Sequence, residues 1–330
     1  MKLGIIGAGK IVKEVLGFIN DIENIKPVAI CSRPESIEKL ESLSKSYGIE
    51  KVYTDYKDLL ADEDIDAVYI AYPNDMHFEI MDAALDFGKN IICEKPFAAN
   101  IGQAMKIFAK ADRKNLYVME AVSHRFLPNA LEIKNKVKDL GKVKIISLNY
   151  SQYSSRYEDF LEEKFAPVFR LENAGGALMD INFYNIDFAV MLFGRPTDVR
   201  YFPNIEKSID TSGVFIMDYD DFKVVCVGAK DSDAENISTI QGDAATIEIA
   251  GPINFCPSFT IKKIGGEIEK INKNQGVSRL FYEFVAFEKI IRENDRARIK
   301  ELEKISLITA EVINQARIES GIFFPSDENV

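Results

Sequence analysis

The chain has 330 residues, 47% of them hydrophobic and 28% charged, and its formal net charge at pH 7 is −11. This balance is typical of a globular protein, and the acidic charge argues against nucleic acid or an anionic membrane surface as a partner. No apolar run approaches the roughly 18 residues needed to span a bilayer, and the N-terminus leads directly into a strand pattern instead of a signal peptide. We therefore predict a cytoplasmic protein of two domains without a membrane partner.

Few residues suit a metal or a disulfide. The chain has four cysteines and two histidines, and no two cysteines form a CxxC pair. Reduced, mostly buried thiols are therefore expected, with neither a metal site nor a disulfide framework.

A strand, a glycine turn and a helix pattern open the chain. The apolar run Leu3–Ile6 precedes Gly7 and Gly9, and Val12 stands where a third small residue is usual in a dinucleotide-binding turn. Glycine lets backbone N–H groups approach a pyrophosphate at the start of the following helix, although an ordinary tight turn is the alternative. The turn residues that we assign to a dinucleotide cofactor are Gly7, Gly9, Lys10 and Ile11.

The end of the second predicted strand, Val28–Cys31, bears on the choice between NADP and NAD. An NAD-preferring site places Asp or Glu here, where the carboxylate accepts from the ribose 2′-hydroxyl. This chain has Ser32 and Arg33 instead, and a hydroxyl and a guanidinium suit a 2′-phosphate. The pair favours NADP. NAD remains the alternative, because Arg33 could be solvated and Glu35 could reach a ribose.

Strands and helices alternate through the first third with short connections, which is typical of a parallel, doubly wound sheet. Ligands of such sheets bind outside the carboxyl ends of the strands. Gly7, Ser32, Tyr72 and the pair Glu94–Lys95 all follow predicted strands. A Glu-Lys pair after a strand is ordinarily a solvated pair of loop charges. Its place among these other strand ends makes Lys95 a candidate for substrate binding.

Several segments recur in an order that is typical of one family. They are Gly7–Ile11, Ser32–Arg33, Ala71–His77, Cys93–Pro96, Met119–Ala121 with Arg125–Phe126, and Gly175–Asp180. In these segments the chain resembles the Gfo/Idh/MocA oxidoreductases, and most closely their branch of dimeric dihydrodiol dehydrogenases and xylose dehydrogenases. The resemblance implies a dinucleotide-binding Rossmann domain, which we place at residues 1–122. A domain for substrate binding and oligomerisation is then expected at residues 123–330.

The resemblance also implies roles for individual residues. It implies that Lys95 holds a substrate hydroxyl or carbonyl near the nicotinamide and that Glu94 lies by the nicotinamide ribose. The Lys95–Pro96 bond of such folds is in some cases cis. Arg170, which follows Phe169, resembles a family arginine that contacts nicotinamide or substrate. The residues implied to line the cofactor crevice are Ala71, Tyr72, Pro73, Asn74 and His77.

The apolar helix predicted over Ala177–Phe193 carries three polar residues, Asp180, Tyr184 and Asp187, at a spacing that puts them on one face. A packed tyrosine with a satisfied hydroxyl is the structural alternative. Many family members have histidine where this chain has Tyr184, and a tyrosine resembles the dihydrodiol dehydrogenase branch. A phenol with a pKa of about 10 needs a nearby cation to work near neutral pH. We therefore expect Tyr184 as proton donor, Lys95 as its electrostatic partner and Asp180 as an orienting group.

Successive strand patterns follow Val199, with no sizeable helix before about residue 275. Such a run is typical of a large open sheet that is mostly antiparallel. In the resembled family this sheet packs on a second copy, so a homodimer or a higher homo-oligomer through the C-terminal sheet is expected. The overall fold class predicted is α/β: a Rossmann domain followed by an α+β domain.

These features combine into one hypothesis. We predict an NADP(H)-dependent oxidoreductase acting on a secondary alcohol or carbonyl of a sugar, polyol or dihydrodiol-like compound. Two alternatives remain. One is a non-catalytic dinucleotide-sensing regulator on the same fold, which would need neither Lys95 nor Tyr184. The other is an NAD-dependent inositol-type dehydrogenase, which is disfavoured because position 32 lacks Asp and position 184 lacks His.

Overall fold

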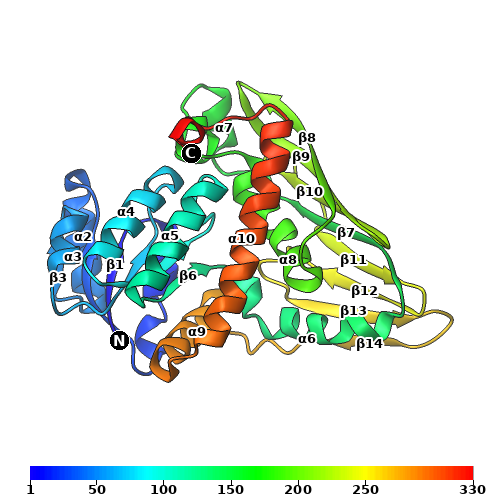
Figure 1. Ribbon diagram of the computed structural model, residues 1–330, viewed down its shortest axis with the longest axis horizontal. Coiled ribbons are helices and arrows are strands. Elements are labelled where there is room, and N and C mark those ends of the chain that lie inside the picture. The colour runs from blue at the N-terminus through cyan, green and yellow to red at the C-terminus, as the bar shows by residue number, and fades with distance from the viewer. Residues whose placement is uncertain (330) are drawn as a thin grey trace. The chain divides into compact units, whose positions relative to one another are not determined.

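The computed structural model describes residues 1–329 and divides the chain into two compact units (Figure 1). Unit 1 comprises Met1–Ala121 and Leu280–Lys304. Unit 2 comprises Val122–Arg279 and the chain from Ile305 onward. The predicted division after residue 122 therefore did not include the return of residues 280–304 to the first unit.

Unit 1 is built on a six-stranded sheet in the order β3-β2-β1-β4-β5-β6, and every strand pair is parallel. The order reverses between β1 and β4, which makes their carboxyl ends the switch point of the sheet. The central strands are buried on both faces, as apolar parallel strands require. The strands are β1 Lys2–Ile6, β2 Lys26–Cys31, β3 Lys51–Tyr53, β4 Ala67–Ile70, β5 Asn90–Glu94 and β6 Val118–Ala121.

Helices connect these strands. Two of them begin with a side-chain cap: the Asp55 carboxylate accepts from the Lys57 amide, and the Asn100 carbonyl oxygen accepts from the Gln103 amide. The helices of this half are α1 Lys10–Leu16, α2 Ile37–Tyr47, α3 Tyr56–Ala61, α4 Asn74–Asp86 and α5 Ile101–Lys114, with short 3-10 turns at Ile19–Asp21 and Pro34–Ser36. The predicted doubly wound parallel fold is confirmed.

The returning segment of unit 1 is held by aromatic packing. The helix α9 (Arg279–Glu293) places the Phe284 ring 5.1 Å from Tyr69 and 6.0 Å from Phe18, measured between ring centroids. The next helix, α10 (Arg296–Glu319), begins in unit 1 and ends in unit 2. Both helices were predicted to lie in the second domain, because the local sequence does not show that an aromatic residue packs against residues far away in the chain.

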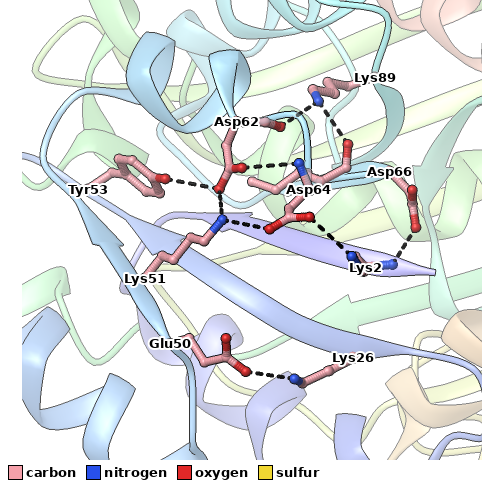
Figure 2. Close-up of polar contacts among 10 residues, drawn as sticks. Lys2, Lys26, Glu50, Lys51, Tyr53, Asp62, Asp64, Asp66 and Lys89 are labelled. Carbon is pink, nitrogen blue, oxygen red and sulfur yellow. Dashed lines mark hydrogen bonds and ion pairs between the residues drawn. The ribbon is translucent and has the colours of Figure 1, made fainter.

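Ion pairs gather at the opposite, amino edge of the same sheet (Figure 2). The Lys51 ammonium lies 2.7 Å from an Asp62 oxygen and 3.0 Å from an Asp64 oxygen. The buried Lys89 donates to two backbone carbonyls, those of Asp62 and Ile65. The amino edge is thus tied by charged side chains.

Unit 2 contains an eight-stranded sheet in the order β14-β13-β12-β11-β7-β10-β9-β8. Only the pair β7 and β10 is parallel among the pairs described, so the sheet is mostly antiparallel as predicted. The strands are β7 Val143–Ser151, β8 Asp198–Glu206, β9 Ile209–Tyr219, β10 Phe222–Ala229, β11 Ile237–Gly242, β12 Ala245–Ala250, β13 Ser258–Lys263 and β14 Ile268–Ile271.

Helix α8 (Phe183–Phe193) lies against one side of this sheet (Figure 1). It continues from a π-helical turn, Leu178–Asn182, so the single regular helix predicted over Ala177–Phe193 is wrong in its first part. A Cβ on Gly228 of β10 would lie 2.5 Å from Asn182 Cβ, so glycine permits this close approach. The other helical elements of unit 2 are α6 Pro128–Lys136, α7 Tyr157–Leu161 and the short turns Ser123–Arg125, Val137–Leu140, Pro167–Phe169, Leu171–Asn173 and Pro325–Asn329.

Candidate active site

The glycine turn after β1 lies at the switch point of the sheet, where the neighbouring strands restrict its conformation. Gly7 has φ +133°, and its N–H donates to the Cys31 carbonyl over 2.8 Å. A Cβ at this position would lie 2.2 Å from the Ala71 carbonyl oxygen, so only glycine fits between β2 and β4. A Cβ on Gly9 would meet nothing within 4 Å. The protein leaves open space beside Gly9, at the start of α1, where Lys10 and Ile11 present the first helical amides.

Ser32 and Arg33 follow β2 on the same edge. Ser32 is buried, and Arg33 is exposed in extended backbone. Burial raises the pKa of the Tyr72 phenol, and the positive charge of Arg33 partly offsets that rise. Arg33 and Tyr72 thus follow β2 and β4 on one edge of the sheet, near enough for the charge of Arg33 to act on the phenol. Ala71, Tyr72, Pro73 and Asn74 are each partly exposed beside the start of α4.

His77 is placed differently from its expected position in the crevice lining, because its side chain is fully buried. Its Nε2 lies 2.8 Å from the Tyr72 carbonyl oxygen and its Nδ1 lies 2.9 Å from the Pro96 carbonyl oxygen. Burial lowers the pKa of the ring, and the backbone carbonyls of Pro96 and Tyr72 partly offset that fall. His77 thus ties the loop after β4 to the loop after β5, and its contribution to a bound ligand is indirect.

The loop that carries Lys95 is fixed from both sides. The Tyr69 hydroxyl donates to Glu94 Oε1 over 2.6 Å, and the Phe97 amide donates to Glu120 Oε1 over 3.0 Å. The Lys95–Pro96 bond is cis, and Lys95 and Glu94 are both partly exposed. Sequence reasoning missed the roles of Tyr69 and Glu120. A carboxylate inside the apolar strand β6 was the available signal for Glu120, since a buried charge needs a partner.

In unit 2, Asp180 lies on the π-helical turn, and its Oδ2 forms an ion pair with the Lys230 ammonium. The Asp180 side chain is 33% exposed, whereas that of Lys230 is 6% exposed. Lys230 was not identified from the sequence, because it is far from Asp180 along the chain and follows an unremarkable strand. A π-helical turn inside a helix is often found at functional sites.

The start of the π-helical turn is held by a second carboxylate. Asp210 Oδ2 accepts from the Leu178 amide over 2.7 Å and from the Tyr201 hydroxyl over 2.8 Å. Gly176, at φ +109°, makes room for this carboxylate, because a Cβ there would lie 2.0 Å from Asp210 Oδ1. Burial raises the pKa of Asp210 to about 6.

Tyr184 follows on α8 and is mostly buried among aromatic rings. Its centroid lies 6.2 Å from the His124 ring and 6.0 Å from the Tyr150 ring. His124 Nε2 lies 2.7 Å from Asp187 Oδ1, and burial lowers the pKa of the His124 ring. These contacts pack the Tyr184 ring against a buried polar network.

Asp187 belongs to that network and does not share a surface with Asp180. It is fully buried and accepts hydrogen bonds from His124, Arg125 and Thr309. Burial alone would raise the pKa of Asp187, but the charge of Arg125 together with the hydrogen bonds from His124 and Arg125 outweighs burial and lowers the pKa. Tyr184 and Asp187 both lie beside His124, whereas Asp180 pairs with Lys230, so the predicted single face holds for Tyr184 and Asp187 but is wrong for Asp180. The physical reason is the π-helical turn, which has more residues per turn than an α-helix and so changes the angle between Asp180 and the residues that follow on α8.

Arg170 is exposed and donates from Nε to the Phe165 carbonyl over 2.8 Å. It belongs to unit 2, whereas the other residues assigned to cofactor binding belong to unit 1. The four cysteines are free and buried. Within residues 1–329, no three or more His, Cys, Asp and Glu side chains are grouped so as to hold a metal ion. Among the helices that the structure describes, none has the length and apolar character to span a membrane.

Comparisons with known proteins agree with this geometry. A family model described as "Oxidoreductase family, NAD-binding Rossmann fold" matches residues 1–122, and one described as "GFO/IDH/MocA C-terminal domain" matches residues 133–248. The chain is 33% identical to the scyllo-inositol 2-dehydrogenase (NADP(+)) IolU of Bacillus subtilis over 99% of both chains. It is 30% identical to a trans-1,2-dihydrobenzene-1,2-diol dehydrogenase of Xenopus tropicalis over 66% of this chain and 65% of that one.

A solved structure gives the same fold. A tyrosine-to-phenylalanine mutant of KijD10, a 3-ketoreductase from Actinomadura kijaniata, in complex with TDP-benzene and NADP, superimposes with a TM-score of 0.82 over 98% of this chain and 99% of that chain. Its sequence identity is 21%, so the likeness concerns the fold.

Proposed function

Because the chain belongs to the Gfo/Idh/MocA family of oxidoreductases, we propose that it transfers a hydride between NADP(H) and a secondary alcohol or carbonyl of a sugar, polyol or dihydrodiol-like molecule. The observation that carries the proposal is the fixed loop after β5. Tyr69 and Glu120 hold the two sides of this loop, so Lys95 is presented at the carboxyl edge of a dinucleotide-binding sheet. A substrate that reacts with a nicotinamide must lie at this edge.

The residues present fit a dinucleotide. The open space beside Gly9 and the amides of Lys10 and Ile11 suit a pyrophosphate, and Ser32 with Arg33 suits a 2′-phosphate. When bound, the cofactor supplies or accepts the hydride. Further members of the proposed site are Ala71, Tyr72, Pro73, Asn74, Glu94 and Arg170.

The chain's own residues handle the proton. In the direction of reduction, the Tyr184 phenol gives its proton to the carbonyl oxygen as negative charge develops there. The Lys95 ammonium binds the same oxygen and stabilises the phenolate that remains. Asp180 orients the substrate and these groups from the π-helical turn. Oxidation of an alcohol runs through the same groups in reverse.

The substrate is proposed to be a polyhydroxylated or diol compound. The relatives IolU and the Xenopus tropicalis enzyme are named for scyllo-inositol and for a dihydrodiol. The inositol-type alternative thus gains support for the substrate, in combination with NADP instead of NAD. The alternative of a non-catalytic regulator is disfavoured, because these relatives are dehydrogenases. Turnover of NADP or NADPH, followed by absorbance with a panel of inositols, aldoses, keto sugars and diols, tests the proposal. No change in absorbance with any member, in either direction, would contradict it.

The cofactor preference has its own test. Thermal unfolding with NADP or NAD at one concentration should show the larger rise in melting temperature with NADP, because a tighter ligand of the folded state stabilises it more. Arg33→Ala should reduce the rise with NADP and leave the rise with NAD nearly unchanged. A larger rise with NAD in the wild-type protein would refute the roles given to Ser32 and Arg33.

The proposal extends to assembly and location. The sheet face opposite α8 presents an apolar row in which Phe202 pairs with Val214 and Val214 with Val227. Phe202 is 56% exposed there, and Ile145 on β7 is 49% exposed. Exposed apolar surface of this kind suits a protein interface, so we place a second copy of the chain on it, as a homodimer or higher homo-oligomer. Four reduced cysteines suit a cytoplasmic location.

A further inference from the structure

Lys230 lies at a position where the burial of a charged side chain costs free energy. It directly follows β10, and its side chain is 6% exposed. Its backbone is fixed on both sides, because its amide donates to the Thr211 carbonyl over 2.8 Å and its carbonyl accepts from the Ser154 amide over 2.9 Å. A lysine ammonium is rarely buried unless it is paired. The partner of Lys230 is the Asp180 carboxylate.

Of the three carboxylates near the Lys230 ammonium, those of Asp180, Asp210 and Asp231, the one that forms the ion pair is Asp180. Asp210 already accepts from the Leu178 amide and the Tyr201 hydroxyl. Asp231 already accepts from the hydroxyls of Thr211 and Ser212, over 2.8 Å and 2.7 Å. The ammonium also lies 5.3 Å from the centroid of the Phe169 ring, which covers it with an apolar, electron-rich face. Lys230 is therefore enclosed, and its ion pair points to the π-helical turn.

The two partners are buried unequally. The lysine is enclosed, whereas a third of the Asp180 side chain is open. Solvent weakens an ion pair on the side of a partly exposed carboxylate, so the stability gained from this pair does not by itself account for enclosing the ammonium. The enclosed ammonium instead binds one oxygen of the accessible Asp180 carboxylate, and this contact fixes the direction in which the carboxylate points.

We infer that Lys230 is a positioning residue for the reaction: by binding Asp180 Oδ2 from inside unit 2, it sets the orientation in which Asp180 meets the substrate. The inference rests on the proposed function, because it gives Asp180 a part in catalysis. It assigns no contact between Lys230 and the substrate. A misplacement of about 1 Å in such a group can lower the rate on the order of 100-fold.

Four variants test the inference by steady-state kinetics: Lys230→Met, Lys230→Arg, Asp180→Asn and the double variant Lys230→Met with Asp180→Asn. Lys230→Met should lower kcat on the order of 10- to 100-fold and leave KM for NADP unchanged. Lys230→Arg should recover most of this loss. If Lys230 acts through Asp180, adding Lys230→Met to Asp180→Asn should lower kcat no further.

Lys207→Met is the matched control. Lys207 also belongs to unit 2 and lies 5.4 Å from the centroid of the Phe160 ring, but it is exposed and donates to the backbone carbonyls of Phe160 and Leu161. It should keep the wild-type kcat. Equal losses in Lys207→Met and Lys230→Met would overturn the inference. Additive losses in the double variant would overturn it as well.

Thermal unfolding of the same variants separates this inference from the proposed function. Lys230→Met should lower the melting temperature more when Asp180 is present than in the Asp180→Asn background. If no substrate is turned over but this coupling is found, the proposed function fails and the ion pair stands. If turnover is found but Lys230→Met has the wild-type kcat, the proposed function stands and the positioning role is wrong.

Discussion

At the scale of single residues, the groups assigned to chemistry depend on buried polar neighbours. The Tyr69 hydroxyl holds Glu94, a Glu120 oxygen holds the amide of Phe97, and the Lys230 ammonium holds Asp180. The motif residues Gly7, Ser32 and Lys95 could be predicted from the sequence, since each follows a strand that the apolar pattern marks. Their supports could not, because pairing between residues far apart in the chain leaves no local pattern.

Asp210 gives a prediction about pH. Burial raises the pKa of this carboxyl from 3.8 to about 6, so the folded state holds the proton more tightly than the unfolded state. The resulting stability is fully present below pH 3.8 and is lost as the pH rises through about 6. A shift of this size corresponds to about 3 kcal/mol in the free energy of unfolding. Asp210→Asn carries no titrating group, so its stability relative to wild type should increase as the pH rises from 4 to 6.5.

Urea unfolding of both proteins across this pH range measures the effect. The control is Asp231→Asn, whose carboxyl in the wild-type protein has a lowered pKa, because hydrogen bonds from Ser212, Thr211, Ser232 and its own backbone amide together outweigh the effect of burial. That variant should not gain stability over the same range. Parallel pH profiles for wild type and Asp210→Asn would show that Asp210 does not titrate in this window.

At the scale of elements, the π-helical turn is the feature that sequence reasoning could not supply. The apolar pattern of Ala177–Phe193 predicts a helix correctly, but it cannot distinguish α-helical from π-helical hydrogen bonding. That difference decides the neighbours of Asp180 and Asp187. The antiparallel strands were easier to predict, because the alternation of apolar and polar residues along them can be read from the sequence. The return of α9 to unit 1 depends on aromatic packing against Phe18 and Tyr69, and was missed.

The close contact between β10 and the π-helical turn gives a prediction for this element. In Gly228→Ala the new methyl group would lie 2.5 Å from Asn182 Cβ, so the turn must shift. Overpacking of this kind costs about 1–3 kcal/mol, and the displaced turn should also lower kcat. Denaturant unfolding and kinetics measure the two effects. Gly266→Ala is the control, since its nearest contact would be Lys263 Cβ at 3.2 Å. Wild-type stability and kcat in Gly228→Ala would contradict the tight packing described.

At the scale of the whole molecule, the two-domain plan and the fold class followed from the sequence, because the alternation of strands and helices stops where the run of strands begins. The predicted boundary was incomplete at residues 280–304. The identity of the substrate could not be predicted from the sequence, because the loops of unit 2 that would bind it show no recognisable sequence pattern.

The exposed apolar row on the outer face of the eight-stranded sheet predicts self-association. Phe202→Glu combined with Val214→Glu places two charges on neighbouring strands of this face, and burying them in an interface would be strongly unfavourable. The variant should sediment as a monomer where the wild-type protein sediments as a dimer or larger species. Ile264→Glu, on a residue that is 70% exposed beyond the end of β13, serves as the control and should keep the wild-type mass. A monomeric wild-type protein would contradict the proposed assembly.

The central claim is that Lys95 of unit 1 and Tyr184 of unit 2 act together in one proton-transfer step. A double-variant cycle on kcat/KM with Lys95→Met and Tyr184→Phe tests it most directly, with the dissociation constant for NADP as a check on cofactor binding. Each single variant should lose on the order of 100- to 10,000-fold in kcat/KM. The double variant should be scarcely worse than the poorer single variant, because groups that act as a unit are not additive, and NADP should still bind. Losses that multiply in the double variant, or wild-type kcat/KM in either single variant, would contradict the account.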